Sequence, residues 1–159
     1  MARTPNYRVT SALIAWAMVV AFASDADDLQ ALREAARCYV AAMKAVLNLP
    51  QAADCPEISA KANDYATAKI AYYKAAREAM PSLIGMVKGE NTDKRYGEDL
   101  IELFRGFGDE EDGEATVLLI SKLRGCENSD KSAQLRKAVE EAQQIAEEFL
   151  EDFGQLVGA

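Results

Sequence analysis

The sequence contains no histidine among its 159 residues. Histidine is the most frequent general base near neutral pH and a frequent metal ligand, so its absence removes histidine-based triads and the usual zinc sites. The glycine-rich phosphate-binding motif is also missing, as is the nucleophile motif Gly-x-Ser-x-Gly. We therefore expect a protein that is not an enzyme and that holds no cofactor and no metal.

Positive charge is scarce in this chain. There are 18 Lys and Arg residues against 26 Asp and Glu residues, which gives a formal net charge of -8. A protein that binds a nucleic-acid backbone needs a basic surface, so we expect no nucleic-acid partner. A strongly acidic surface instead attracts a basic protein partner by long-range electrostatics.

The longest uncharged run lies in the N-terminal region. Two arginines precede the uncharged residues 9–23, which are too few for a membrane span of about 20 apolar residues. This stretch ends on Ala-Phe-Ala, a pattern typical of signal-peptide cleavage sites. We predict that residues 1–23 are a signal peptide cleaved after Ala23 and that residues 24–159 are exported, to a periplasm or the exterior. The alternative is an uncleaved, membrane-anchored N-terminal helix.

Strand-like alternation is not prominent, and apolar residues recur at helical spacing instead. Asp54 followed by Pro56 indicates a helix start, and Pro81 indicates a helix break. The pattern predicts helices over 26–48, 54–80, 93–105, 114–124 and 129–156, with a short apolar turn near 82–88.

Two of these helices carry a clear apolar stripe that we expect to face the core. The stripe of helix 54–80 contains Ile58, Ala62, Tyr65, Tyr72, Ala76 and Met80. The stripe of helix 129–156 contains Leu135, Val139, Ala142, Ile145, Ala146, Phe149, Phe153 and Leu156.

The helix lengths indicate an architecture. Three helices span about 35–42 Å each, and the two short helices within 93–124 reach a similar length end to end. This favours an all-α fold, an up-down four-helix-type bundle whose third member is broken into short helices. We expect residues 24–159 to form this single helical-bundle domain.

The three cysteines can be sorted by that layout. It places the loop after the first helix and the loop before the last helix at the same end, and these loops carry Cys55 and Cys126. Cys38 lies about 15 Å further down the first helix, whereas a disulfide requires Cα atoms within about 7 Å. We predict a Cys55–Cys126 disulfide, with Cys38 free on an alanine-rich face. The alternative is three unpaired thiols.

The acidic run at 109–114 does not fit a calcium-binding loop, because Gly108 and Leu119 occupy positions where the EF-hand requires acids. We expect a solvated loop in which Asp112 caps the following helix. Two aromatic residues are further candidates for surface contacts. Tyr73 lies further round its helix than the apolar stripe, and Phe107 lies between two glycines. The candidate interaction surface comprises Tyr73, Phe107, Asp109, Glu110, Glu111, Asp112, Glu140, Glu147, Glu148 and Glu151.

Together these patterns predict an exported acidic helical protein that acts by binding another protein. The most concrete form is an immunity or inhibitor-type neutraliser of a basic partner. One alternative is a carrier of a small apolar ligand bound between the helices near the broken third member. Another is a membrane-anchored helical protein, and a third is a histidine-free enzyme that works with paired carboxylates.

Overall fold

The computed structural model describes residues 25–87, 109–126 and 130–156. All the secondary structure within these ranges is helical: α2 (Asp25–Leu47), α3 (Cys55–Glu78), α4 (Met80–Val87), α6 (Asp109–Arg124) and α7 (Asp130–Leu156). The predicted all-α bundle is therefore confirmed. The predicted signal peptide and the predicted helix 93–105 lie outside the described residues.

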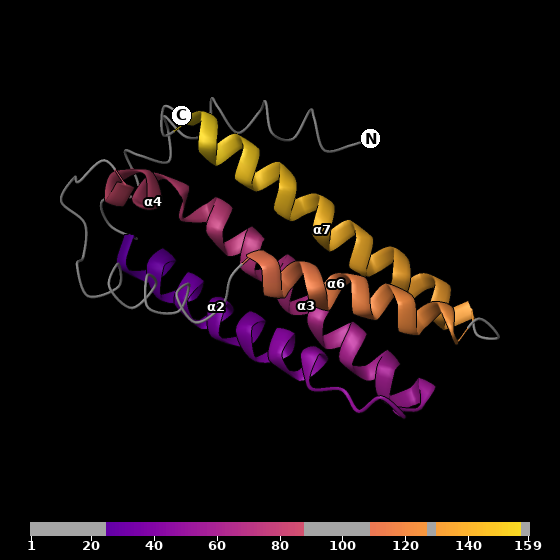
Figure 1. Ribbon diagram of the computed structural model, residues 1–159. Coiled ribbons are helices and arrows are strands. Elements are labelled where there is room, and N and C mark those ends of the chain that lie inside the picture. Colours follow the sequence, from indigo (N-terminus) through magenta and orange to yellow (C-terminus); the bar gives the residue numbers. More distant parts are fainter. Residues whose placement is uncertain (1–24, 88–108, 127–129, 157–159) are drawn as a thin grey trace.

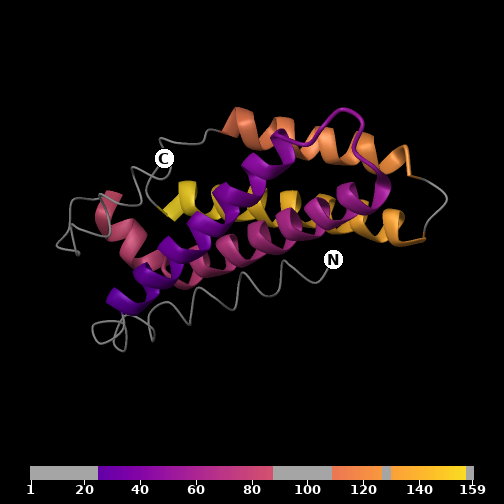
Figure 2. The ribbon, with the colours of Figure 1, turned by 90° about the horizontal axis from the view of Figure 1, so that it is seen from below.

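Helix α3 packs against two neighbouring helices over most of its length. It packs on one side against α2 and on the other against α7, while α6 packs mainly against α7 and α2. Figures 1 and 2 show that α2 and α3 run in opposite directions, that α7 runs the same way as α3, and that α6 runs the opposite way. Because α3 has neighbours on two sides, a wide arc of its surface is buried.

The start and end of α3 follow from local chemistry. The Asp54 side chain accepts a hydrogen bond from the backbone N–H of Glu57 at 2.9 Å, and Pro56 lies in the first turn, as the sequence predicts. The helix ends at Glu78, slightly before Pro81, because proline lacks an N–H and its ring clashes with the carbonyl four residues earlier. The apolar segment predicted as a turn near 82–88 is helix α4, which starts at Met80.

Helix α6 begins at Asp109, five residues before the predicted start at Glu114. The expectation of a loop over 109–114 is therefore wrong, whereas the expected exposure of Glu110, Glu111 and Glu114 is confirmed. Gly113 does not interrupt the helix, although glycine is about 1 kcal/mol less favourable than alanine inside a helix. The predicted last helix is confirmed as α7, with its start within one residue of the expected position.

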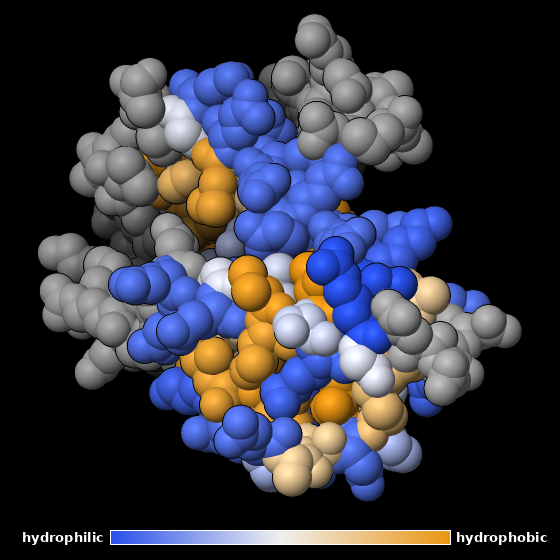
Figure 3. Space-filling view, turned by 45° about the vertical axis from the view of Figure 1, so that its right-hand side comes forward, coloured by the Kyte–Doolittle hydropathy of each residue, from blue (hydrophilic) through white to orange (hydrophobic). Residues whose placement is uncertain are grey.

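The apolar stripe predicted for residues 54–80 is buried in full, with its last member, Met80, in α4. Most of the predicted α7 stripe is buried or half-buried, but Leu156, at the end of the helix, is 44% exposed. Hydrophobic residues also reach the surface elsewhere: Val117 is 69% exposed and Leu150 is 49% exposed. Figure 3 shows hydrophobic residues lying between hydrophilic ones on the face that is turned forward. Among the described helices, none combines the length and the apolar character that a membrane crossing requires.

Candidate functional site

The centre of the bundle contains a cluster of polar side chains, which we call the buried polar cluster. Each of the four long helices contributes at least one member: α2, α3, α6 and α7. Its members are Tyr39, Tyr65, Lys69, Asp112, Thr116 and Gln143.

Lys69 is the most enclosed charge in the described part of the chain, with 0% of its surface exposed. Its Nζ donates to Asp112 Oδ2 at 2.7 Å, to Gln143 Oε1 at 2.5 Å and to Tyr65 Oη at 3.2 Å. An ammonium has three N–H donors, so these three acceptors satisfy it completely. The Nζ also lies 5.3 Å from the centre of the Tyr65 ring, which adds a cation–π contact.

One carboxylate oxygen of Asp112 pairs with the Lys69 ammonium, and the other accepts hydrogen bonds from two phenol groups. Tyr39 Oη and Tyr65 Oη each donate to Asp112 Oδ1 at 2.5 Å. Because the Tyr65 proton goes to Asp112, Thr116 Oγ1, 2.8 Å away, is the donor to Tyr65 Oη. The carboxylate is therefore held from α2 and α3 at once, and it fixes the position of α6 relative to both.

Burial alters the titration of these groups. Burial, together with neighbouring Tyr73 and Asp112, raises the pKa of Tyr39, and burial followed by the Asp112 charge raises the pKa of Tyr65. Burial lowers the pKa of Lys69, while Asp112 and Glu147 act in the opposite direction. Both phenols consequently stay protonated and act as hydrogen-bond donors near neutral pH.

The geometry defines what the buried polar cluster can do. A solute reaches the Lys69 ammonium only if a helix moves, since no part of that side chain is exposed. In the closed bundle the cluster therefore holds helices in place rather than handling a substrate. Removing one partner of such a pair leaves an uncompensated buried charge, which makes the arrangement intolerant of change.

The sequence patterns contained a signal for this cluster that hydrophobic periodicity missed. Lys69 occupies the vacant position of the α3 stripe, four residues after Tyr65 and three before Tyr72. Asp112 similarly begins the buried stripe of α6 that continues through Ala115, Leu119 and Leu123. A lysine and an aspartate that each interrupt an apolar stripe are candidates for a buried pair.

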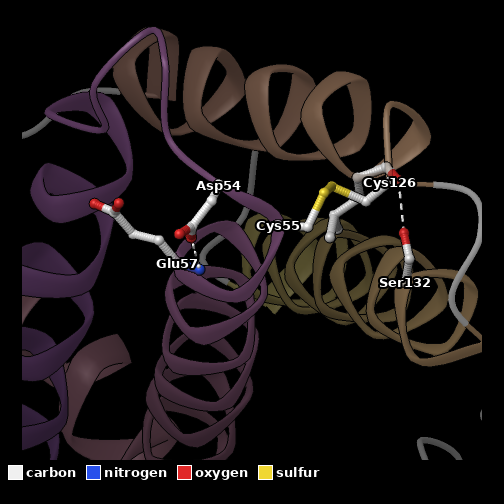
Figure 4. Close-up of a disulfide and its surroundings, with 6 residues drawn as sticks. Asp54, Cys55, Glu57, Cys126 and Ser132 are labelled. Carbon is white, nitrogen blue, oxygen red and sulfur yellow. Dashed lines mark hydrogen bonds between the residues drawn. A yellow bond between two sulfur atoms is a disulfide. The ribbon is translucent and has the colours of Figure 1, made fainter.

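The predicted disulfide joins the start of α3 to the end of α6, at one end of the bundle. Cys55 and Cys126 are bonded, with their Cα atoms 5.9 Å apart, and Cys38 is a free, exposed thiol. Figure 4 shows the disulfide beside the N-cap of α3, with Ser132 close to Cys126. Ser132 Oγ donates to the Leu123 carbonyl at 2.6 Å, which ties the start of α7 to the end of α6. The disulfide and this hydrogen bond together fix the C-terminal end of α6.

Three of the predicted surface residues lie in the interior. Asp112 is 9% exposed, because its carboxylate bonds to the buried polar cluster instead of capping a helix. Tyr73 is 8% exposed, because α3 is covered on two sides and the Tyr73 ring lies 5.6 Å from the Phe149 ring of α7. Glu148 is 7% exposed and takes part in a polar or electrostatic contact, which offsets the cost of burying a carboxylate.

Other predicted surface residues are exposed: Glu110 and Glu111 on α6, and Glu140, Glu147 and Glu151 on α7. The three on α7 are separated by seven and four residues, which places them on one side of the helix. We call these three the acidic row. Asp109 is the first residue of α6, its side chain is not described, and Phe107 lies outside the described residues.

The acidic row is connected to the interior. Gln143 Nε2 donates to Glu147 Oε1 at 3.2 Å, while Gln143 Oε1 accepts from Lys69. One amide side chain thus links an exposed carboxylate to the buried ammonium. Within the described residues, no group of three or more carboxylate or thiol side chains gathers closely enough to hold a metal ion.

Comparison of the chain with protein families, with curated proteins and with solved structures finds no match in any of the three.

Proposed function

We propose that this protein acts outside the cytoplasm by binding a basic protein partner through the acidic row, as a neutraliser of the immunity or inhibitor type. The observation that carries the proposal is the placement of Glu140, Glu147 and Glu151, three exposed carboxylates on one side of α7. Their charges add to the excess of acidic residues in the whole chain.

The acidic row has the electrostatic properties of a surface that recognises a basic protein. Carboxylates on a regular helix have fixed spacing, so they present a directional pattern to an approaching basic surface. Such complementary charge raises association rates and selects partners of opposite sign. The disulfide between Cys55 and Cys126 is compatible with an oxidising compartment, in which the predicted export would place the chain.

The test is a quantitative binding experiment with matched variants. The chain is immobilised, a basic protein is captured from the secreted fraction of the source organism, and its Kd is measured at low and high salt. The first variant combines Glu140→Gln, Glu147→Gln and Glu151→Gln. The control combines Glu34→Gln, Asp64→Asn and Glu78→Gln, which removes the same charge from exposed positions on α2 and α3.

We expect the acidic-row variant to bind about tenfold more weakly, because each exposed ion pair contributes up to about 1 kcal/mol. The control variant should bind within about twofold of the unmodified chain. Equal weakening in both variants would mean that only net charge matters, and binding that is insensitive to salt would contradict an electrostatic interface.

A further inference from the structure

The two halves of α6 are attached to the bundle by different kinds of contact. The C-terminal half buries Leu119 and Leu123 completely, and Cys126 of the disulfide lies two residues beyond its end at Arg124. The N-terminal half, residues 109–116, buries Asp112, Ala115 and Thr116 among its described side chains. None of these is a large apolar residue.

This difference matters because hydrophobic stabilisation grows with the apolar area removed from water. Ala115 offers one methyl group, whereas Leu119 and Leu123 offer two complete side chains at 0% exposure. The hold on the N-terminal half therefore depends on the hydrogen bonds of Thr116 and Asp112 and above all on the ion pair between Asp112 and Lys69.

The charged and titratable groups around Asp112 come from three helices. Tyr39 faces it from α2, and Tyr65 and Lys69 face it from α3. Tyr73 acts on both phenols, and Glu147 of α7 acts on Lys69. Asp112 itself belongs to α6, and it forms the ion pair with Lys69.

Proton uptake by Asp112 breaks its ion pair with Lys69. The carboxylate becomes a neutral acid, and Lys69 keeps its charge with no direct counter-ion in a fully enclosed position. Burying an unpaired ammonium is costly, and hydration of Lys69 relieves that cost. Water can reach Lys69 if the weakly attached half of α6 moves away, while the disulfide keeps the other half in place.

We propose that α6 is a hinged flap, latched by the Lys69–Asp112 ion pair, anchored by the Cys55–Cys126 disulfide, and opened by protonation of Asp112. In the open state the ammonium of Lys69 and the hydroxyls of Tyr39 and Tyr65 face solvent. The flap is a device within the bundle and needs no binding partner.

Hydrogen–deuterium exchange with mass spectrometry on the full, disulfide-bonded chain tests the flap. The pH is lowered in steps from about 7 to about 3, with correction for the intrinsic exchange rate. We expect peptides from residues 109–116 to lose protection by about a few hundredfold or more, the equilibrium equivalent of a broken buried ion pair. Peptides from the centre of α3 and from residues 119–124 should keep theirs. Unchanged protection at 109–116, or equal loss in α3 and α7, would overturn the proposal.

Two variants identify the latch. Asp112→Asn keeps the size of the side chain but removes its charge, so the flap should be open already at neutral pH and should not respond further to acid. The double variant Lys69→Met/Asp112→Leu removes both charges, so the flap should stay closed at every pH tested. An acid-induced opening that persists in the double variant would contradict the latch, and this result is decisive even if Asp112→Asn fails to fold.

A third variant identifies the anchor. In Cys55→Ser/Cys126→Ser, acid should release residues 119–124 together with residues 109–116, because the covalent restraint on the end of α6 is gone. Retained protection of residues 119–124 in this variant would show that the disulfide does not restrain the flap.

Discussion

Two neighbouring clusters in the core of this bundle are stabilised in different ways. The buried polar cluster centres on Lys69 and Asp112, whereas an aromatic cluster one turn further along α3 contains Tyr72, Tyr73, Phe149 and Phe153. In the aromatic cluster the Tyr72 and Tyr73 rings lie 4.8 Å apart, and the Phe149 and Phe153 rings stack at 5.7 Å. Tyr39 belongs to both clusters, since its ring lies 5.2 Å from Tyr72 and its hydroxyl donates to Asp112.

The difference between the clusters lies in what each requires of its members. Aromatic contacts gain energy from buried area and tolerate several geometries, so a similar residue can replace a member at moderate cost. The polar cluster needs a partner for every donor and acceptor, so it enforces one arrangement of α2, α3, α6 and α7. We infer that the aromatic cluster contributes bulk stability and that the polar cluster contributes specificity of helix placement.

The largest expected effect is that of Lys69→Met, which leaves the Asp112 carboxylate buried without its counter-ion. We expect the free energy of unfolding to fall by about 3–5 kcal/mol in urea denaturation. The double variant Lys69→Met/Asp112→Leu should recover most of this loss, because no charge remains in the core. A loss below about 1 kcal/mol in the single variant would mean that the polar cluster tolerates substitution as well as the aromatic cluster does.

An intermediate effect is expected in the dependence of stability on alkaline pH. Tyr39 and Tyr65 have a raised pKa in the folded state, so the folded chain keeps two protons that the unfolded chain loses above about pH 10. Their contribution is fully present below that pH and is lost above it, at about 1.4 kcal/mol per pH unit for each phenol. Lys69 has a lowered pKa, so its titration raises stability up to about pH 10.5 and has no further effect above it.

Tyr39→Phe and Tyr65→Phe separate these contributions. Each variant should reduce the downward slope above about pH 10.5 by about 1.4 kcal/mol per pH unit, as measured by urea denaturation across the alkaline range. A slope that is unchanged in both variants would mean that neither phenol is held protonated by the core.

The smallest expected effect is that of Phe149→Leu in the aromatic cluster. Leucine retains most of the buried apolar area, and neighbouring rings can adjust, so we expect a loss of about 1 kcal/mol. Thermal or urea denaturation measures this directly. A loss as large as that of Lys69→Met would contradict the distinction between a tolerant and an intolerant cluster.

Much of the fold could be predicted from the sequence because its causes are local. Asp54 and Pro56 start α3 through contacts within one turn, and helical periodicity locates the α7 stripe. Simple geometry was also sufficient for the disulfide, since helix lengths alone bring Cys55 and Cys126 to the same end. The start of α6 was missed because Gly113 and the acidic run favour a loop by local rules.

The candidate site was harder to predict because its members are far apart in the chain. Lys69 and Asp112 are 43 residues apart, and Lys69 and Gln143 are 74 residues apart. Periodicity assigns a charged residue to the surface unless its partner is known. Tyr73 was misplaced for a related reason, since its burial depends on α7 lying beside α3.

The sequence by itself determined the helical content, the main helix boundaries and the cysteine pairing, because capping, periodicity and helix length act over short distances. The tertiary structure alone decided which helices flank α3 and which charges meet in the core. It also decided that Asp112 belongs to a buried pair rather than to a solvated acidic surface. A buried charge is stable only beside its partner, and that partner comes from another helix.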